Sequence, residues 1–157
     1  MERVHALGGT VASVSIRDAA AGDFAAVTAL LAELGRPAVG VGDTGAARVV
    51  YERHLARTET ASLVAVVGGA VVGFLSLEFR DRLNRTRPQA WIPDLIVTAA
   101  HRGTGVGRAL LARGIAQARR RQCWSIMLES GSNRHAAHAL YRRLGLVDEG
   151  SYWIQYF

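Results

Sequence analysis

The stretch Val97-Thr-Ala-Ala-His-Arg-Gly-Thr-Gly-Val-Gly-Arg108 is the most informative part of this sequence. It joins an apolar segment of β character to a segment whose apolar residues recur at helical spacing. Its three glycines, at every second position, remove side chains from the turn, so that another group can approach the backbone closely. Unpaired N–H groups at a helix start attract anions, and Arg102 and Arg108 add positive charge. We therefore predict a phosphate or pyrophosphate site here.

Two familiar phosphate-binding loops do not match this stretch. A Walker loop ends in Gly-Lys-Ser/Thr, and the chain has no lysine. The dinucleotide fingerprint Gly-x-Gly-x-x-Gly requires two residues before its last glycine, whereas one residue separates Gly105 from Gly107. Neither a Walker-type nucleotide site nor a dinucleotide-binding fold is therefore expected.

The segments around the loop predict one α+β domain over residues 14–157, preceded by a loosely ordered leader over 1–13. Pro93 interrupts an apolar strand and removes one ladder hydrogen bond, which suggests a bulge or an open edge. Asp23 and Asn133 are expected to cap the first and the last helix. We predict strands at 14–17, 63–67, 71–79, 89–98 and 124–129, helices at 24–34, 46–57, 105–121 and 134–144, and a β-rich aromatic tail over 148–157.

Composition bounds the class of protein. The chain has 157 residues, of which half are apolar and 20% are charged, so it can bury a hydrophobic core. Its longest apolar run, residues 63–75, is too short to cross a bilayer, and residues 1–13 lack the pattern of a signal peptide. Cys123 is the single cysteine, which excludes an internal disulfide and a cysteine-based zinc site. We expect a cytoplasmic protein that uses no metal.

The net charge of +6 is concentrated in one segment. Residues 99–143 hold nine arginines against one acid, whereas the rest of the chain holds ten arginines against twelve acids. Such a segment indicates an anionic partner, which could be a phosphate-bearing cofactor, nucleic acid or a membrane surface, or else a solvated helix face. Because Trp124 and Tyr141 are its only aromatic residues, nucleic acid is the weakest of these partners.

The pattern Arg102-x-x-Gly105-x-Gly107 resembles the coenzyme A loop of the GNAT superfamily of N-acetyltransferases. Trp91–Val97 is similar to the family's fourth strand, and Asn133–Leu146 is similar to its cofactor-contacting fourth helix. Ile16-Arg17, with the helix after it, resembles the family's opening, so the resemblance covers about residues 14–157. It implies a single α+β domain with a mixed, mostly antiparallel sheet flanked by helices. The central strands of that sheet would splay apart, and acetyl-CoA would lie in the gap.

The same resemblance implies which residues bind acetyl-CoA. The backbone of one central strand would pair with the pantetheine amides, the glycine loop would hold the pyrophosphate, and the residue before the last helix would contact the pantetheine arm. An ordinary core strand and a plain helix cap are the alternative interpretations of the first and the last of these. The implied cofactor-binding residues are Leu95, Ile96, Val97, Arg102, Gly103, Thr104, Gly105, Val106, Gly107, Arg108 and Asn133.

Two catalytic residues are also implied. Tyr141 matches the tyrosine that protonates the departing thiolate in many family members, and a phenol is chemically suited to that task. The alternative is a core tyrosine on the apolar face of the helix. Asp94 is the first candidate for the base that deprotonates the amine, because a carboxylate among apolar residues of a strand requires an explanation. Glu129 is the second candidate and His138 is the third.

The resemblance therefore implies an enzyme that moves an acetyl group from acetyl-CoA to a primary amine by direct attack in a ternary complex. A small metabolite or antibiotic is a better fit than a protein acceptor, and no nucleic-acid or membrane partner is expected. Two alternatives stay open: a GNAT-like acyl-CoA-binding sensor or partner-binding module without turnover, and a nucleic-acid-binding protein that uses segment 99–143. A homodimer formed through strands, with the aromatic tail as a contact surface, is a further expectation.

Overall fold

The computed structural model describes residues 13–150 and residue 155, so the predictions for residues 1–12 and for most of the aromatic tail lie outside the described residues. The predicted elements over the described part are present, with bounds that differ by a few residues. The segment predicted as one strand over 89–98 forms two strands. The strands are β1 (Ser15–Asp18), β2 (Thr60–Val67), β3 (Ala70–Arg80), β4 (Gln89–Ile92), β5 (Leu95–Val97) and β6 (Ser125–Leu128), and the helices are α1 (Phe24–Glu33), α2 (Thr44–Ala56), α3 (Val106–Arg120) and α4 (His135–Arg143).

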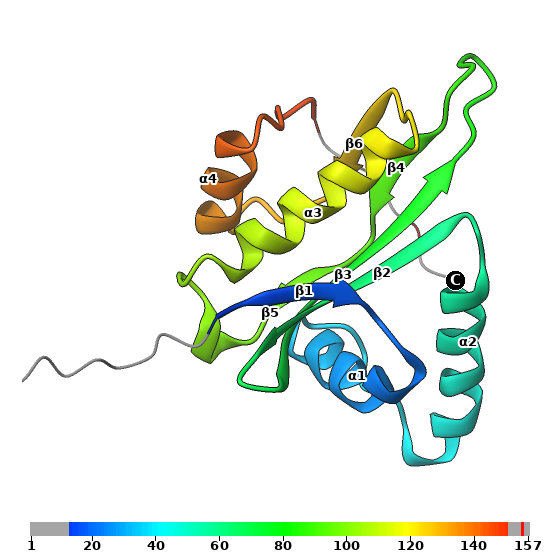
Figure 1. Cartoon of the computed structure of the whole chain (residues 1–157), viewed down its shortest axis with the longest axis vertical. Helices are drawn as coiled ribbons and strands as arrows, with labels where there is room; N and C mark the ends of the chain where they lie inside the picture. Colours follow the sequence, from blue (N-terminus) through cyan, green and yellow to red (C-terminus); the bar gives the residue numbers. More distant parts are fainter. Residues whose placement is uncertain (1–12, 151–154, 156–157) are drawn as a thin grey trace, which may run out of the picture.

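One mixed sheet holds the strands in the order β1-β2-β3-β4-β6, and β5 pairs with β3. Every pairing is antiparallel except that of β4 with β6, which is parallel. Helices α3 and α4 cover one face of the sheet, and α1 and α2 cover the other (Figure 1). This arrangement confirms the predicted α+β class. None of the described helices is long and apolar enough to cross a membrane.

Alternation along β2 and β3 divides the core between the two faces. Leu63, Leu75 and Leu77 belong to a buried cluster with Leu110 and Leu111 of α3. The residues between them point the opposite way, because successive side chains of a strand face opposite sides. A second buried cluster lies on that opposite face. It combines Val64 of β2, Phe74 of β3 and Ile96 of β5 with Val27 and Leu30 of α1.

A bulge separates β4 from β5. Leu75 pairs with Leu95 and Glu78 pairs with Trp91. Two residues of β3 therefore lie opposite three residues, 92–94, of the segment that joins β4 to β5. The bulge expected at Pro93 is therefore confirmed. Before it, β4 follows β6 up to the Ile92–Leu128 pair, and after it β5 pairs with β3 alone among the described strands. The two central strands thus part at this point, which leaves the outer edge of β5 open.

The two predicted helix caps have different outcomes. Asp23 occupies the N-cap position of α1, as expected, but its side chain makes no capping hydrogen bond to that helix. Asn133 does not cap α4, because the N-cap is Arg134 and no side chain caps that end. A backbone turn precedes the helix there: the Arg134 N–H donates to the Gly131 carbonyl at 3.1 Å, which places Asn133 inside the turn. The prediction for Asn133 as a cap was wrong for this reason.

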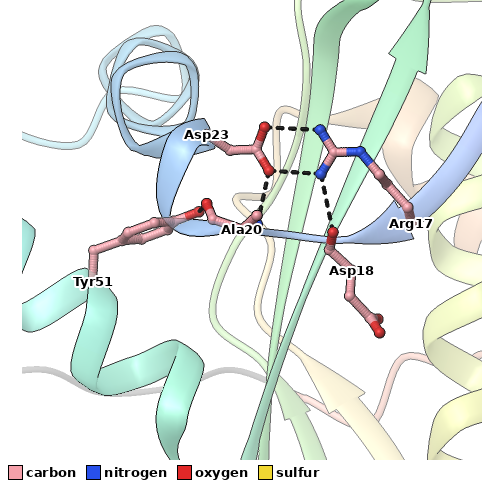
Figure 2. A network of polar contacts seen from close by, with 5 residues as sticks. All are labelled: Arg17, Asp18, Ala20, Asp23 and Tyr51. Carbon is pink, nitrogen blue, oxygen red and sulfur yellow. Dashed lines mark hydrogen bonds and ion pairs between the residues drawn. The ribbon is translucent and has the colours of Figure 1, made fainter.

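A network around the Asp23 carboxylate and the Ala20 backbone joins β1 to both helices of its face (Figure 2). The carboxylate accepts two hydrogen bonds from the Arg17 guanidinium, at 2.7 and 2.9 Å, and a third from the Ala20 N–H at 2.8 Å. The Tyr51 hydroxyl of α2 donates to the Ala20 carbonyl at 2.9 Å. The hydrogen bonds with Arg17 lower the pKa of the Asp23 carboxyl, and they outweigh the opposing effect of its burial. This network holds the start of α1 against α2.

Candidate active site

The open edge of β5 lines the gap between the central strands. The Ser76 N–H donates to the Asp94 carbonyl at 3.0 Å, and the Thr98 N–H donates to the Val72 carbonyl at 2.9 Å. Backbone groups of a strand alternate in direction, so those of Ile96 also face β3, whereas those of Leu95 and Val97 face the gap. Ile96 instead contributes a buried side chain, 4% exposed, to the second core cluster. Of the three predicted strand residues, two therefore present backbone groups to the gap.

The glycine loop presents a run of backbone N–H groups beside this gap. Gly103 and Gly105 have φ values of 76° and 92°, in the left-handed region that favours glycine. Gly105 is the N-cap of α3, and no side chain caps this end. The Ala109 N–H donates to the Gly105 carbonyl at 3.0 Å. The backbone N–H groups of residues 103–108, which include Thr104 and Val106, donate to no acceptor among the described residues. They are available to an anion at the positive end of the helix dipole.

The start of α3 packs closely against both other walls of the gap. A Cβ atom built on Gly107 would lie 3.5 Å from Leu140 of α4 and 3.6 Å from Val97 of β5. Farther along α3, a Cβ on Gly114 would lie 3.3 Å from Leu75 of β3. Small residues on α3 therefore set its distance from the sheet, and the loop amides are held beside the β5 edge.

The side chain of Arg102, which was predicted to bind the cofactor, makes contacts within the protein at the entry of the loop. Its Nε donates to the Val97 carbonyl at 2.9 Å, and its Nη2 donates to the Glu33 carboxylate at 3.0 Å. The same Glu33 oxygen accepts the Ala99 N–H at 2.7 Å. Arg102 and Glu33 thus join the entry of the loop to the end of α1. Arg108 is exposed and forms no ion pair with a described residue, so its charge is the freer of the two.

Tyr141 lies on α4 in a half-buried cluster with two other polar side chains. The His138 Nε2 and the Ser130 hydroxyl lie 3.2 Å apart, and the rings of His138 and Tyr141 have centroids separated by 6.2 Å. Burial raises the pKa of the Tyr141 phenol, although hydrogen bonding with Ser130 and the charge of Arg134 act in the opposite direction. The phenol therefore stays protonated at neutral pH. The sequence interpretation did not include Ser130.

Asp94 lies at the bulge, and its partners explain a carboxylate on an apolar strand. Its Oδ1 accepts a hydrogen bond from the Arg36 Nε at 3.0 Å, and its Oδ2 accepts one from the Ser76 hydroxyl at 3.2 Å. The Arg36 Nη2 also donates to the Pro93 carbonyl at 2.9 Å. The side chain of Asp94 remains 19% exposed, so a ligand can still reach it.

Arg36 reaches the bulge because of how α1 ends. Gly35 has φ 96°, its N–H donates to Ala32, and the Arg36 N–H donates to Leu31, both at 3.0 Å. This is the left-handed termination that reverses the chain direction after a helix. The sequence contained this signal in Gly35, but sequence separation hid the partner, since Arg36 and Asp94 are 58 residues apart.

Two further predicted residues, Glu129 and Asn133, are exposed, and Cys123 is the single cysteine. Glu129 is exposed and accepts a hydrogen bond from the Trp91 indole at 2.8 Å. Asn133 is exposed in the turn before α4. Cys123 packs against the main core, and burial raises the pKa of its thiol, which makes it a poor nucleophile.

The geometry agrees with what comparison with known proteins finds. A model of the acetyltransferase (GNAT) family matches residues 27–146, so this chain belongs to the GNAT family. No curated protein matches the sequence.

Solved structures share the fold over nearly the whole chain. A transcriptional regulator from Bacillus halodurans C-125 has a TM-score of 0.83 at 24% identity, over 92% of this chain and 100% of that one. A proposed acetyltransferase from Agrobacterium tumefaciens str. C58 has a TM-score of 0.80 at 29% identity, over 90% and 99%. An aminoglycoside N-acetyltransferase in complex with CoA has a TM-score of 0.75 at 20% identity, over 93% and 95%.

Proposed function

We propose that this protein is an acetyl-CoA-dependent N-acetyltransferase whose acceptor is a primary amine on a small molecule. The observation that carries the proposal is the pairing of an open strand edge with a run of unpaired loop amides. Coenzyme A combines amide groups, which can pair with a strand edge, with a pyrophosphate, which suits a helix N-terminus. The aminoglycoside N-acetyltransferase in complex with CoA, which shares this fold, supports the same cofactor.

The cofactor would be held mainly by backbone groups. Leu95 would bind the pantetheine arm through its N–H and C=O groups, and Val97 would bind it through its N–H, since the Val97 carbonyl already accepts a hydrogen bond from Arg102. The amides of residues 103–108 would bind the pyrophosphate, and Arg108 would add charge to that site. Ile96 would support the edge from the core, and Arg102 would fix the entry of the loop.

The chemistry would need one proton donor and one proton acceptor from the chain. Bound acetyl-CoA supplies a thioester carbonyl as the electrophile. Tyr141 would donate its phenolic proton to the departing sulfur, because burial keeps the phenol protonated. Asp94 would accept the proton that the amine must lose, and Arg36 and Ser76 would hold its carboxylate in place. No covalent enzyme intermediate is required, since the amine attacks the thioester directly.

The acceptor would approach from the face of the sheet that α1 and α2 cover, because the Asp94 carboxylate lies on that face. A small metabolite or an antibiotic fits this proposal, and the fold similarity to an aminoglycoside N-acetyltransferase supports a small amine. We also propose a cytoplasmic location. The single cysteine supports it, because secreted proteins are often stabilised by disulfides and this chain cannot form an internal one.

Calorimetric titration with acetyl-CoA, free coenzyme A and a short RNA duplex tests the proposal, together with a thiol-release assay on a panel of amines. We expect micromolar acetyl-CoA binding and thiol release with at least one amine. Acetyl-CoA binding without thiol release from any amine would favour a sensor. The Bacillus halodurans transcriptional regulator has a similar fold, which motivates this alternative. Salt-sensitive RNA binding without acetyl-CoA binding would contradict the proposal.

A further inference from the structure

Two buried polar atoms beneath α2 have no hydrogen-bond partner among the described residues: the His54 Nε2 and the Ser62 hydroxyl. Ser62 is only 5% exposed. A buried polar atom without a partner is costly, and such atoms usually bond to ordered water. His54 lies near the end of α2, and Ser62 lies on β2, the strand that packs against that helix.

Ser62 belongs to a polar row that crosses the sheet to Asp94. Ser62 of β2 pairs in register with Ser76 of β3, and the Ser76 hydroxyl donates to the Asp94 carboxylate at 3.2 Å. Both serines share a face with Val64 and Phe74, which pack against α1, so the row lies on the face that α1 and α2 cover. Directly opposed side chains have Cβ atoms about 4.5–5.5 Å apart, which leaves room for a bridging water between two hydroxyls.

His54 has one ring nitrogen engaged and the other free. The imidazole hydrogen bonds to the Ala61 backbone, and the Thr60 hydroxyl donates to the His54 carbonyl, which fixes the end of α2 over β2. Burial lowers the pKa of His54, Arg57 adds to that effect, and Glu78 of β3, Asp94 and the Ala61 hydrogen bond oppose it. The lowered pKa favours a neutral ring at pH 7, and the unpartnered Nε2 is a proton acceptor in the tautomer that carries its N–H on Nδ1.

A cavity of about 330 Å³ meets the end of this row at the edge of the sheet. It is lined by Leu55, Thr60, Ala61 and Ser62 on the side of α2, and by Gln117 and Arg120 of α3 on the other side. The cavity gives water access to the strand that carries the unpartnered hydroxyl.

We propose that Ser76, Ser62 and His54, joined by water, form a proton relay that leads from Asp94 to the edge of the sheet. This inference rests on the proposed N-acetyltransferase function. The relay would give the proton an exit from Asp94, whose carboxylate is held between Arg36 and the Ser76 hydroxyl.

In the relay, an N–H bond of the acceptor amine breaks and an O–H bond forms on Asp94. The Ser76 hydroxyl, which donates to Asp94 in the structure, rotates toward water, and Asp94 then passes its proton to the Ser76 oxygen as Ser76 releases its own hydroxyl proton to that water. The transfer continues past Ser62, and the last water gives a proton to the His54 Nε2. Both serines end with one proton each, His54 becomes an imidazolium, and nothing is oxidised or reduced.

Paired substitutions at Ser62 test whether the hydroxyl matters. Ser62→Val and Ser62→Thr have nearly the same shape and both suit a strand, but only Thr keeps a hydroxyl. We expect kcat to fall about tenfold or more in Ser62→Val, as for the loss of a proton-transfer group, and to be largely restored in Ser62→Thr. The acetyl-CoA affinity should be unchanged in both. Equal kcat values in the two variants would overturn the relay.

His54→Asn removes the free ring nitrogen while keeping an N–H that can reach Ala61. In the wild type, kcat/KM should fall as the pH drops through the lowered pKa of His54, because the protonated ring cannot accept. His54→Asn should lose that acidic limb. Arg53→Gln, an exposed neighbour on the same helix, should keep it. An acidic limb that persists in His54→Asn would contradict the assignment of His54.

Nuclear magnetic resonance titration of His54 separates the relay from the proposed function. Asp94→Asn should lower the His54 pKa further, because it removes a negative charge that raises it, whereas Asp148→Asn should not. If His54 responds in this way but no amine gives thiol release, the proposed function fails and the connection between the two residues stands. If thiol release occurs and His54 does not respond to Asp94→Asn, the relay is wrong and the proposed function stands.

Discussion

The two sides of the central strands are built from different parts of the chain. On the side of the gap, the β5 edge and the glycine loop present mainly backbone groups, and adjacent residues supply them. On the side covered by α1 and α2, Arg36, His54 and Asp94 are side chains from three separate segments. Under the proposed function, backbone N–H and C=O groups hold the cofactor on one side. On the other side, particular side chains bind the acceptor amine and take its proton.

The largest effect is expected from Gly105→Glu. The residue has a left-handed φ, so any side chain strains the loop, and a carboxylate would repel the phosphates. Acetyl-CoA affinity measured by calorimetry should fall about 100-fold or more. Gly69→Glu, at φ 83° in the β2–β3 turn, adds the same charge and a similar strain elsewhere and should keep the affinity. Equal losses in the two variants would mean that the loop position is not special.

Tyr141→Phe should lower kcat about 100-fold, with little change in acetyl-CoA affinity, because it removes only the proton donor. Burial raises the Tyr141 pKa, so the wild-type rate should keep this donor through neutral and mildly alkaline pH and lose it only above about pH 10. Tyr51→Phe is the matched control, since that phenol lies on the other face and burial raises its pKa to about 12. An unchanged pH–rate profile in Tyr141→Phe would assign the acid to another group.

Asp23→Asn tests the side-chain anchoring of α1. It should lower the free energy of unfolding at pH 7 by about 1–2 kcal/mol, as for the loss of a charged hydrogen bond. The Asp23 pKa is lower in the folded state than its usual value of 3.8, so its stabilisation is present above that pH and is lost as the pH falls through the folded pKa.

Denaturant unfolding from pH 7 to pH 3 measures that difference, which should shrink toward the acid end. Asp43→Asn is the matched control, because Asp43 is the N-cap of α2 and makes no side-chain cap bond there. A stability difference between Asp23→Asn and wild type that is the same at every pH would contradict the ion-pair explanation.

The smallest effect is expected from Arg102→Ala, which should weaken acetyl-CoA binding about threefold to tenfold. If Arg102 acts by bracing the loop against Glu33, then Glu33→Ala should have a similar effect and the double variant should be little worse. If Arg102 binds a phosphate directly, the two effects should add, and Arg102→Ala alone should reduce the salt dependence of binding.

Local signals explain what the sequence could predict. Helical spacing, the Gly68-Gly69 turn and Pro93 each act within a few residues, so the order of elements and the bulge followed from them. The free loop amides were predictable for the same reason, because the alternating glycines and the helix start lie within six residues of the sequence.

Contacts between distant segments explain what the sequence could not predict. Glu33 and Ala99 are 66 residues apart, and no local pattern joins them, so the contact of Glu33 with the entry of the loop was not predicted. Ile96 was predicted to bind the cofactor together with Leu95 and Val97. Which backbone groups face the gap depends on the pairing register with β3, which the sequence does not show. Asn133 was interpreted as a cap because the turn closed by Gly131 has no distinct sequence signal.

Amide hydrogen exchange, followed with and without acetyl-CoA, tests most directly whether backbone groups hold the cofactor. We expect the Leu95 and Val97 amides and those of residues 103–108 to gain protection when acetyl-CoA is added. The Ile96 amide, which already pairs with β3, should be protected in both states. Protection that appears only at arginines of α3 and α4, with no change at the β5 edge or the loop, would contradict the assignment of the cofactor to this gap.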